Sequence, residues 1–184
     1  MQARSIVRRT RFFLAVEGES EQSFVRWLQV LSDGKLSIHL DSYPLNGGGF
    51  QSMLENAVLL HGRQARSKGP YRERFLIVDG DRADRGEDWP IDRLREEAAN
   101  HQIIVFVQRP KHEGLLYRMA PGKERDIPTA ATAESKLRVH WPNYQKPANA
   151  HTLGGHFSLD DLLRVAAVDS DLGLLLRTIG LMEN

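Results

Sequence analysis

Two apolar runs that end in acidic residues decide the fold of this 184-residue chain. The first is FFLAV (residues 12–16), followed by Glu17 and Gly18, and the second is FLIV (residues 75–78), followed by the segment DGDR (79–82). Short apolar runs of this kind are typical of the buried strands of a parallel sheet. Because parallel strands end at the same edge of a sheet, we expect Glu17, Asp79 and Asp81 to lie close together.

Strands and helices alternate along the first 110 residues. The apolar pattern predicts strands at 11–16, about 36–43, 75–79 and 103–107, and helices at 20–31, 50–61 and 91–100. Ser20 is the expected N-cap of the first helix. The basic segment 63–74 is expected at the opposite edge of the sheet as a solvated loop, with contact to a partner or to nucleic acid as the alternative. This order predicts an α/β fold in which a four-stranded parallel sheet is flanked by helices.

The pattern becomes helical after Pro110. Helices are expected at 113–119 and 130–140, residues 141–155 are expected to be irregular, and two helices finish the chain. Ser158 and Asp161 form a capping-box pattern at the start of the first of these, and Gly180 follows the last one as a left-handed cap. We therefore expect one domain, with a core at about 10–110 and a helical C-terminal extension at about 111–184.

Composition narrows the function classes. The net charge is only +1, so any binding to nucleic acid must come from local basic patches. The chain contains no cysteine, which excludes disulfides and thiolate metal sites and favours a reducing cytoplasm. No run approaches the roughly 20 apolar residues of a membrane span. We expect a soluble cytoplasmic protein that makes no use of a membrane.

The acidic strand ends indicate a metal site. Carboxylates that converge repel one another unless they share a cation or a proton, and hard oxygen ligands suit Mg²⁺ or Mn²⁺. Asp79 and Asp81 are the expected ligands, while Glu17 is expected to transfer a proton or to bridge a second ion. The alternative is that the two aspartates only cap the turn after their strand.

Two further glutamates are candidate ligands. Glu113 follows the fourth strand and is therefore expected at the same edge, although it could equally be a helix-start carboxylate beside Lys111. Glu21 falls in the first turn of a helix, where a carboxylate is favoured by the helix dipole in any case. The pair His112-Glu113 is not a zinc-protease motif, because Leu116 stands where the second histidine would be required.

Basic and aromatic residues near this edge are candidates for phosphate and base contacts. Guanidinium and ammonium groups suit phosphate, and the candidates are Arg82, Arg85, Arg109, Lys111 and Lys146. The glycine run 47–49 could present backbone N–H groups to a phosphate, or could simply be a turn. The aromatic residues in 140–144 could stack on a base beside Lys146, or could pack the C-terminal helices on the sheet.

The motifs resemble those of a known superfamily. A Glu-Gly turn at 17–18 and an Asp-x-Asp turn at 79–81, with strand–helix order between them, resemble the Toprim domain of primases, topoisomerases and related nucleases. The segments EGESE (17–21), RPKHEGLL (109–116) and WPNYQK (141–146) are similar to the RloB-like group of Toprim proteins. The chain departs from that group at His112, where an aromatic residue is usual, and at Leu115, where a large ring is usual.

The resemblance implies a fold and an activity. It implies that the first and third strands are neighbours, and that the protein is a Mg²⁺- or Mn²⁺-dependent nuclease cleaving DNA or RNA in bacterial anti-phage defence. It also leaves room for a protein partner, such as an ATPase of a defence system. The alternative is a non-catalytic Toprim module that binds metal and a partner as a regulatory subunit. A phosphatase with Asp79 as nucleophile is disfavoured, because such enzymes carry their Asp-x-Asp after the first strand.

Overall fold

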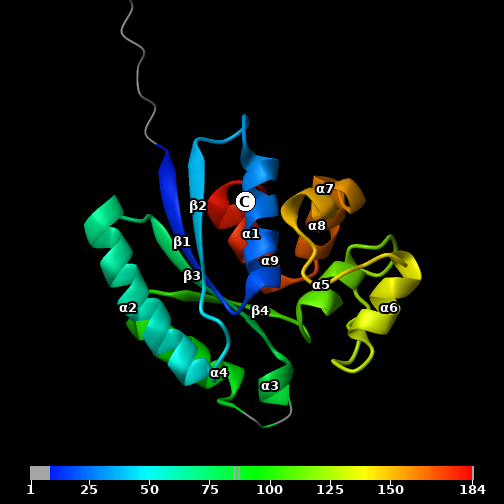
Figure 1. Cartoon of the computed structure of the whole chain (residues 1–184), viewed down its shortest axis with the longest axis horizontal. Coiled ribbons are helices and arrows are strands. Elements are labelled where there is room, and N and C mark those ends of the chain that lie inside the picture. The colour runs from blue at the N-terminus through cyan, green and yellow to red at the C-terminus, as the bar shows by residue number, and fades with distance from the viewer. Residues whose placement is uncertain (1–8, 85, 87, 184) are drawn as a thin grey trace, which may run out of the picture.

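The structure is a computed structural model and describes residues 9–84, 86 and 88–183. In this part of the chain four parallel strands form one sheet in the order β2-β1-β3-β4 (Figure 1). The strands are β1 (Thr10–Val16), β2 (Ile38–Pro44), β3 (Glu73–Asp79) and β4 (Ile104–Gln108). The predicted α/β fold with a four-stranded parallel sheet flanked by helices is confirmed, as is the expected neighbourhood of the first and third strands.

Helices connect the strands and make up the C-terminal part. They are α1 (Glu19–Ser32), α2 (Phe50–Lys68), α3 (Asp81–Asp84), α4 (Ile91–Asn100), α5 (His112–Arg118), α6 (Ala133–His140), α7 (Ala150–His156), α8 (Leu159–Ala166) and α9 (Ser170–Ile179). None of these helices, which lie within the described residues, is long and apolar enough to cross a bilayer.

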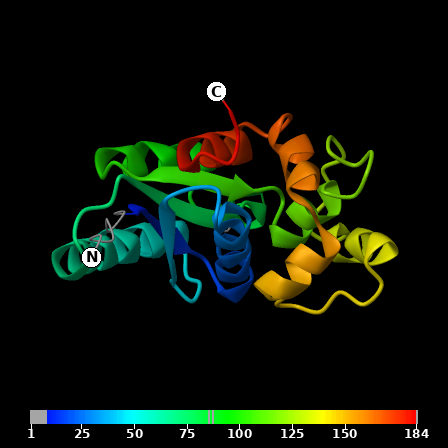
Figure 2. The ribbon, with the colours of Figure 1, turned by 90° about the horizontal axis from the view of Figure 1, so that it is seen from above.

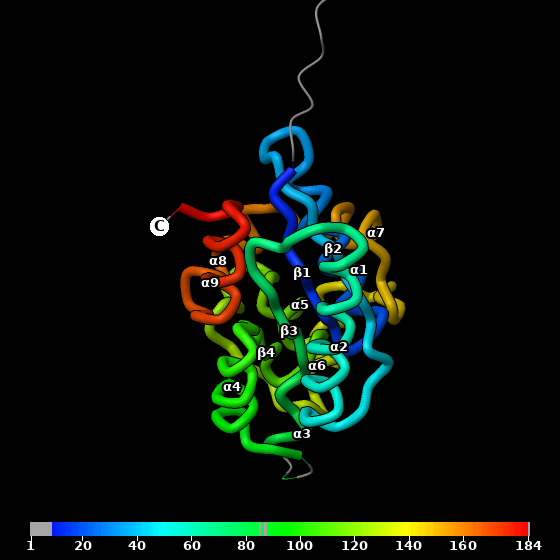
Figure 3. The backbone as a smooth tube through the Cα atoms, turned by 90° about the vertical axis from the view of Figure 1, so that its left-hand side faces the viewer, coloured from blue at the N-terminus to red at the C-terminus, as the bar shows by residue number. Residues whose placement is uncertain are grey.

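Helices cover both faces of the sheet because its central strands are apolar on both sides. Phe12, Leu14 and Val16 of β1 pack into the cluster formed with α1 and α9. The alternate residues Phe13 and Ala15 pack into a second cluster, formed with α2 and α4. Successive side chains of a strand point to opposite faces, so one buried strand contributes to two cores. Figure 3 views the molecule from the side of α2.

The C-terminal helices lie beside the sheet, and the last one returns to it (Figure 2). Helix α7 packs against α1, and α9 packs against β4. Asp171 in the first turn of α9 accepts a hydrogen bond from the backbone N–H of Val107 at 3.3 Å and pairs with Arg95 at 2.5 Å. The buried Arg118 of α5 pairs with Asp169, the N-cap of α9, at 2.6 Å. Helix α9 is therefore fixed to both the sheet and the C-terminal helices.

Several local predictions are corrected by the structure. Gly18, not Ser20, is the N-cap of α1, because the side chain of Glu21 reaches back to the backbone N–H of Gly18 and starts the helix earlier. Helix α2 continues to Lys68, so the first half of the basic segment 63–74 is helix rather than loop. Residues 63–68 of this segment include no large apolar residue, so the sequence shows no helical periodicity there.

The end of the chain follows the predictions more closely. The capping box of Ser158 and Asp161 is confirmed, and Gly180 adopts a left-handed conformation with φ 84°. The irregular segment predicted at 141–155 is wrong in its second half, where α7 forms. Asn149 caps this helix by accepting a hydrogen bond from the backbone N–H of Thr152 at 2.9 Å. The glycines at 154 and 155 masked that helix in the sequence.

Candidate functional site

The ends of β1 and β3 meet at the carboxyl edge of the sheet. Val16, the last residue of β1, is level with Ile77 of β3. The next residue, Glu17, accepts a hydrogen bond at Oε2 from the backbone N–H of Asp79 at 3.0 Å. Glu17 therefore turns toward β3 rather than behind the sheet, as the strand order predicts. This side chain is 17% exposed, so solvent reaches it.

Gly80 brings the end of β3 close to β4. Its backbone N–H donates to the carbonyl of Gln108 at 3.0 Å, and an added Cβ would lie 3.0 Å from a methyl carbon of Val107. A residue without a side chain permits this approach. Asp81, directly after it, begins the short helix α3. The two aspartates are thus divided between a strand end and a helix start.

Asp79 also contacts the beginning of α5. Its Oδ1 accepts a hydrogen bond from the backbone N–H of His112 at 2.9 Å. The imidazole of His112 is buried, and its Nδ1 lies 3.8 Å from Glu21 Oε1 and 3.3 Å from Gln108 Oε1. Burial lowers the pKa of His112, although the carboxylates of Glu21 and Glu113 oppose that shift. His112 therefore connects three elements of the site, α1, β4 and α5.

Burial and neighbouring carboxylates raise the pKa of Asp79 well above its usual value. Burial is the largest cause, followed by the negative charges of Glu21, Glu17 and Glu113, while Lys146 acts in the opposite direction. The pKa of Glu17 is also raised, first by burial and then by Glu21 and Asp81, against the hydrogen bond from Asp79 and the charge of Arg82. Both shifts favour the protonated forms of these two carboxyl groups.

Glu113 lies beneath this edge and is fully buried. Its Oε1 pairs with Lys146 Nζ at 2.8 Å and accepts a hydrogen bond from the Tyr144 hydroxyl at 3.4 Å. Its Oε2 has no hydrogen-bond partner among the described residues, and Lys111 Nζ stays 3.9 Å away. Burial alone would raise the pKa of Glu113, but the bond and charge of Lys146 outweigh it and lower that pKa.

A pocket of about 460 Å³ opens over these groups. It is lined by residues 17–21, Asn46, Gly47, Asp79, Lys146 and Pro147. Three of the five predicted metal ligands, Glu17, Glu21 and Asp79, therefore face one cavity, and Lys146 is the cation within it. Glu113 does not line the pocket but forms an ion pair with Lys146, which does. Asp81 lies near enough to Glu17 to raise the pKa of Glu17.

The carboxylates are not preassembled as a cation cage. Among the residues that the structure describes, no three Asp, Glu or His side chains are grouped closely enough to hold a metal ion. The donor chemistry nevertheless fits a hard cation, because the acidic groups at this edge offer only carboxylate oxygens. Glu113 Oε2 has no hydrogen-bond partner among the described residues, and Glu17, Glu21 and Glu113 are all close enough to Asp79 to raise its pKa. A cation would stabilise such a group of carboxylates in the ionised form.

The predicted phosphate-binding residues do not all share this pocket. Arg82 lies at the edge, with its Nε 3.7 Å from Glu17 Oε1. Arg109 instead lines a separate cavity with Arg95 and Arg118, so its placement in the acidic site is not supported. Arg85 lies outside the described residues.

The glycine run and the aromatic residues have structural contacts. The backbone N–H of Gly47 donates to the carbonyl of Glu17 at 3.0 Å, and that of Phe50 donates to Asp88 at 2.7 Å, so both are already bonded. Trp141 and Tyr144 are buried against each other with ring centroids 5.1 Å apart. Of the alternatives given for the aromatic segment, packing applies to these two rings.

Sequence reasoning missed Gln108 and His112 as parts of the site. Gln108 is 1% exposed and its amide nitrogen has no partner among the described residues. The available signal was a polar residue directly at the end of the continuously apolar fourth strand, where burial was expected. Buried polar side chains are hydrogen-bonded in most proteins. Gln108 was therefore a candidate for positioning a residue of the site, as its contact with His112 does in the structure.

We compared the chain with protein-family models, curated proteins and solved structures, and none of them matches it.

Proposed function

We propose that this protein is a Mg²⁺- or Mn²⁺-dependent nuclease whose site is the acidic carboxyl edge of the sheet. The observation that carries the proposal is the meeting of Glu17 and Asp79 from adjacent parallel strands in one open pocket, with Glu21 and Glu113 close enough to raise the pKa of Asp79. Open parallel sheets bind ligands at this edge, where the strand order reverses.

The residues divide into distinct roles. Glu17, Asp79 and Asp81 would hold the ion, with Glu21 as a further oxygen donor at the pocket wall. A bound divalent cation polarises a phosphoryl oxygen and stabilises charge in the transition state. Glu17 has a raised pKa and is open to solvent, so it suits a proton-transfer role. Lys146 and Arg82 place positive charge at the pocket, where a phosphodiester would lie.

The contacts around the site position its carboxylates. Lys146 partly neutralises Glu113 and opposes the rise in the Asp79 pKa. One oxygen of Glu17 accepts a hydrogen bond from the backbone N–H of Asp79. One oxygen of Asp79 accepts a hydrogen bond from the backbone N–H of His112. The second oxygen of Glu17 lies 3.7 Å from Arg82, a long contact that a ligand can replace.

The resemblance to Toprim proteins of the RloB-like group supports the proposed nuclease function. We propose accordingly that the chain is a cytoplasmic member of that superfamily, that it acts in bacterial anti-phage defence, and that it works with a protein partner such as an ATPase. The strand order, with β1 beside β3, is the order that the resemblance implies.

One observation favours a second function. No three acidic or imidazole groups in the described residues are grouped closely enough to hold a metal ion. This arrangement favours the alternative that the protein is a non-catalytic Toprim module that acts through a partner. In that case the site binds a metal ion and a partner as a regulatory subunit, and the Lys146–Glu113 pair has a structural role. The two functions differ in one property, since only the nuclease cleaves a phosphodiester when Mg²⁺ or Mn²⁺ is added.

The test is a cleavage panel with the purified full chain. End-labelled single- and double-stranded DNA and RNA of one sequence are incubated with Mg²⁺, Mn²⁺ or EDTA. We expect cleavage of at least one substrate with a divalent ion and none in EDTA. Isothermal titration with Mn²⁺, for the parent and for Asp79→Asn, separates the functions. Metal binding without cleavage of any substrate would favour the non-catalytic module.

A further inference from the structure

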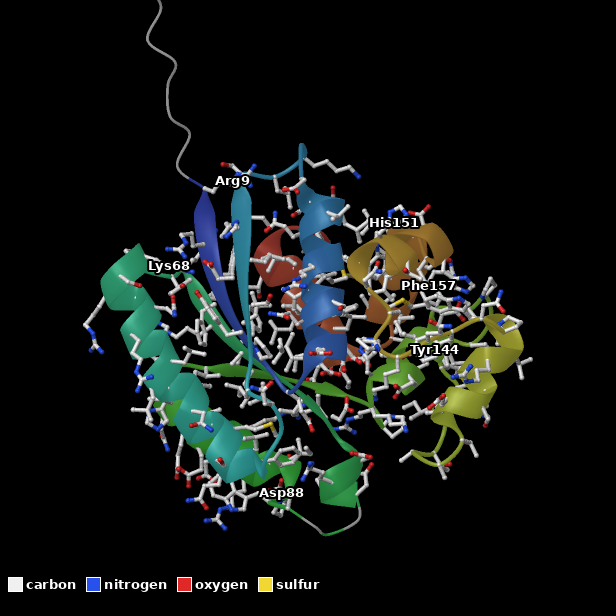
Figure 4. All side chains as sticks on the ribbon, in the orientation of Figure 1. Arg9, Lys68, Asp88, Tyr144, His151 and Phe157 are labelled. Carbon is white, nitrogen blue, oxygen red and sulfur yellow. The ribbon has the colours of Figure 1, made fainter. Side chains whose placement is uncertain are left out.

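A second pocket lies at the amino edge of the sheet, opposite the acidic site. It has a volume of about 710 Å³ and is formed where β1 begins and α2 ends. Five of its lining residues are basic, namely Arg9, Arg11, His39, Lys68 and Arg72. Figure 4 shows Arg9 and Lys68 at this end of the molecule, with Asp88 at the other end.

The charge of this pocket is strongly one-sided. Four lining residues are Lys or Arg, and none of the lining residues, all of which are described, is acidic. The nearest carboxylate, Asp41, lies behind the wall with 7% of its side chain exposed. It pairs with Arg11, with His39 at 3.4 Å and with Lys68 at 3.5 Å. The single negative charge of Asp41 is thus shared by three basic side chains.

Asp41 and two tyrosines hold the inner cations in place. The guanidinium of Arg11 lies over the ring of Tyr71, 4.7 Å from its centroid, and bonds to the carbonyl of Lys68. Lys68 Nζ donates to the hydroxyl of Tyr43 at 2.9 Å. Side chains fixed by such contacts lose less conformational freedom when a ligand binds. The inner wall is therefore a preorganised cationic surface.

The outer cations remain available to a ligand. Arg72 is exposed, and Arg9 has 56% of its side chain exposed, with one long contact of 3.8 Å to the exposed Asp33. Exposed pairs of this kind contribute little energy, so an incoming anion can replace Asp33. Arginine matches the geometry of a phosphate through two parallel N–H groups.

We infer that this basic pocket is a phosphate-binding site, separate from the acidic edge. The shared chemistry is the phosphate group, which a nucleic-acid backbone or a free nucleotide can supply. A seven-residue strand spans about 23 Å, which is the length of roughly seven base pairs of B-form DNA. One nucleic acid could therefore reach from this pocket toward the acidic edge. The inference does not depend on catalysis, because binding is measured without metal.

The experiment measures binding of the full chain in EDTA, where no cleavage occurs. A fluorescein-labelled 20-base-pair DNA duplex and the matching single-stranded DNA and RNA are titrated by anisotropy at several salt concentrations. Inorganic phosphate and a nucleoside diphosphate are titrated by calorimetry. The double variant Arg9→Glu/Arg72→Glu is compared with Arg26→Glu, an exposed arginine of α1 outside the pocket.

For a nucleic-acid ligand, we expect the double variant to bind the polynucleotide at least tenfold more weakly in 50 mM salt. The salt dependence should flatten by about two units of slope, since each lost phosphate contact contributes about 0.9. Arg26→Glu should stay within threefold of the parent. For a free-phosphate ligand, the double variant loses only the calorimetric signal of phosphate or the nucleoside diphosphate.

The inference is overturned if the double variant binds every probe as the parent does, or if the parent binds none of them. It is also overturned if Arg26→Glu weakens binding as much as the double variant, because the effect would then be one of net charge. Melting temperatures of all variants are recorded. Both substituted arginines are exposed, so we expect these temperatures to agree within a few degrees.

Discussion

The backbone N–H of Asp79 donates a hydrogen bond to Glu17 Oε2 over 3.0 Å, and this bond joins the ends of β1 and β3. Its energy alone is modest. Its importance is positional, because it turns the Glu17 carboxylate toward the pocket shared with Glu21 and Asp79. An isosteric change to glutamine preserves the acceptor oxygen, so the site can be altered chemically without losing this bond.

Asp79→Asn should not destabilise the metal-free protein. The substitution removes a charge that burial and three glutamates oppose, and the amide oxygen can still accept the N–H of His112. We expect a melting temperature in EDTA equal to or above that of the parent, and loss of most of the increase that Mg²⁺ or Mn²⁺ gives the parent. The measurement is thermal unfolding with and without each ion.

The control for this substitution is Asp92→Asn, on the exposed face of α4. It should leave the metal effect unchanged. If Asp79→Asn unfolds several degrees below the parent in EDTA, the aspartate is a structural cap and the crowding argument is wrong.

The raised pKa values of Asp79 and Glu17 predict how stability depends on pH. A carboxyl whose pKa is higher in the folded than in the unfolded state favours folding most when it is protonated. That contribution is lost as the pH rises from below the ordinary values, 3.8 for Asp and 4.5 for Glu, through the raised ones. Asp79→Asn/Glu17→Gln should therefore gain stability relative to the parent between acidic and neutral pH.

Urea unfolding in EDTA at intervals from pH 4 to pH 8 checks this expectation. Glu113 and Asp161 have lowered pKa values and act in the opposite sense, losing their contribution as the pH falls. The difference between variant and parent isolates Asp79 and Glu17 from these groups. A difference that is constant over the whole range would contradict the assigned shifts.

Lys146→Ala should destabilise the protein, because it removes the closer of the two cations near the buried Glu113 and leaves Lys111 at 3.9 Å. Breaking a buried pair costs several kcal/mol, but Lys146 is 51% exposed, so we expect about 1–3 kcal/mol after allowing for solvent. Lys35→Ala, at an exposed lysine, is the control. Adding Glu113→Gln to Lys146→Ala should recover part of the loss, measured by a double-mutant cycle.

Gly114→Ala and Gly62→Ala should have opposite effects on stability. A Cβ at Gly114 would lie 2.5 Å from the ring of Pro110 and 3.0 Å from the carbonyl of Arg109, so we expect a loss of about 1–3 kcal/mol. Gly62 lies within α2 with nothing near its Cβ position, and alanine there should gain about 0.5–1 kcal/mol. Chemical denaturation of the two variants provides the comparison.

The fold was largely predictable because its strands are continuous apolar runs with acidic ends. FFLAV and FLIV mark the two central strands, and their order with the helices decides the topology. The C-terminal half was less predictable. Helix α7 contains two glycines and only one fully buried apolar residue, Leu153, so its periodicity was weak. The continuation of α2 to Lys68 was hidden for a similar reason, since its last turns are polar.

The site was predictable only where chain position alone determines geometry. Glu17 follows β1 and Asp79 ends the neighbouring β3, and the structure brings them together. Arg109 follows β4 just as directly, yet its side chain lines a different cavity, beside Arg95 and Arg118. The orientation of a long side chain after a strand depends on packing with other elements, here α4 and α5, which no local pattern records.

The measurement that tests the central claim most directly is single-turnover cleavage of a labelled substrate in Mn²⁺ by the parent and by Glu17→Gln. The account predicts a rate about 100-fold or more lower for the variant, with nucleic-acid binding unchanged and with Glu96→Gln, at an exposed residue of α4, cleaving like the parent. Cleavage by Glu17→Gln at the parental rate would contradict the assignment of the acidic edge as the active site.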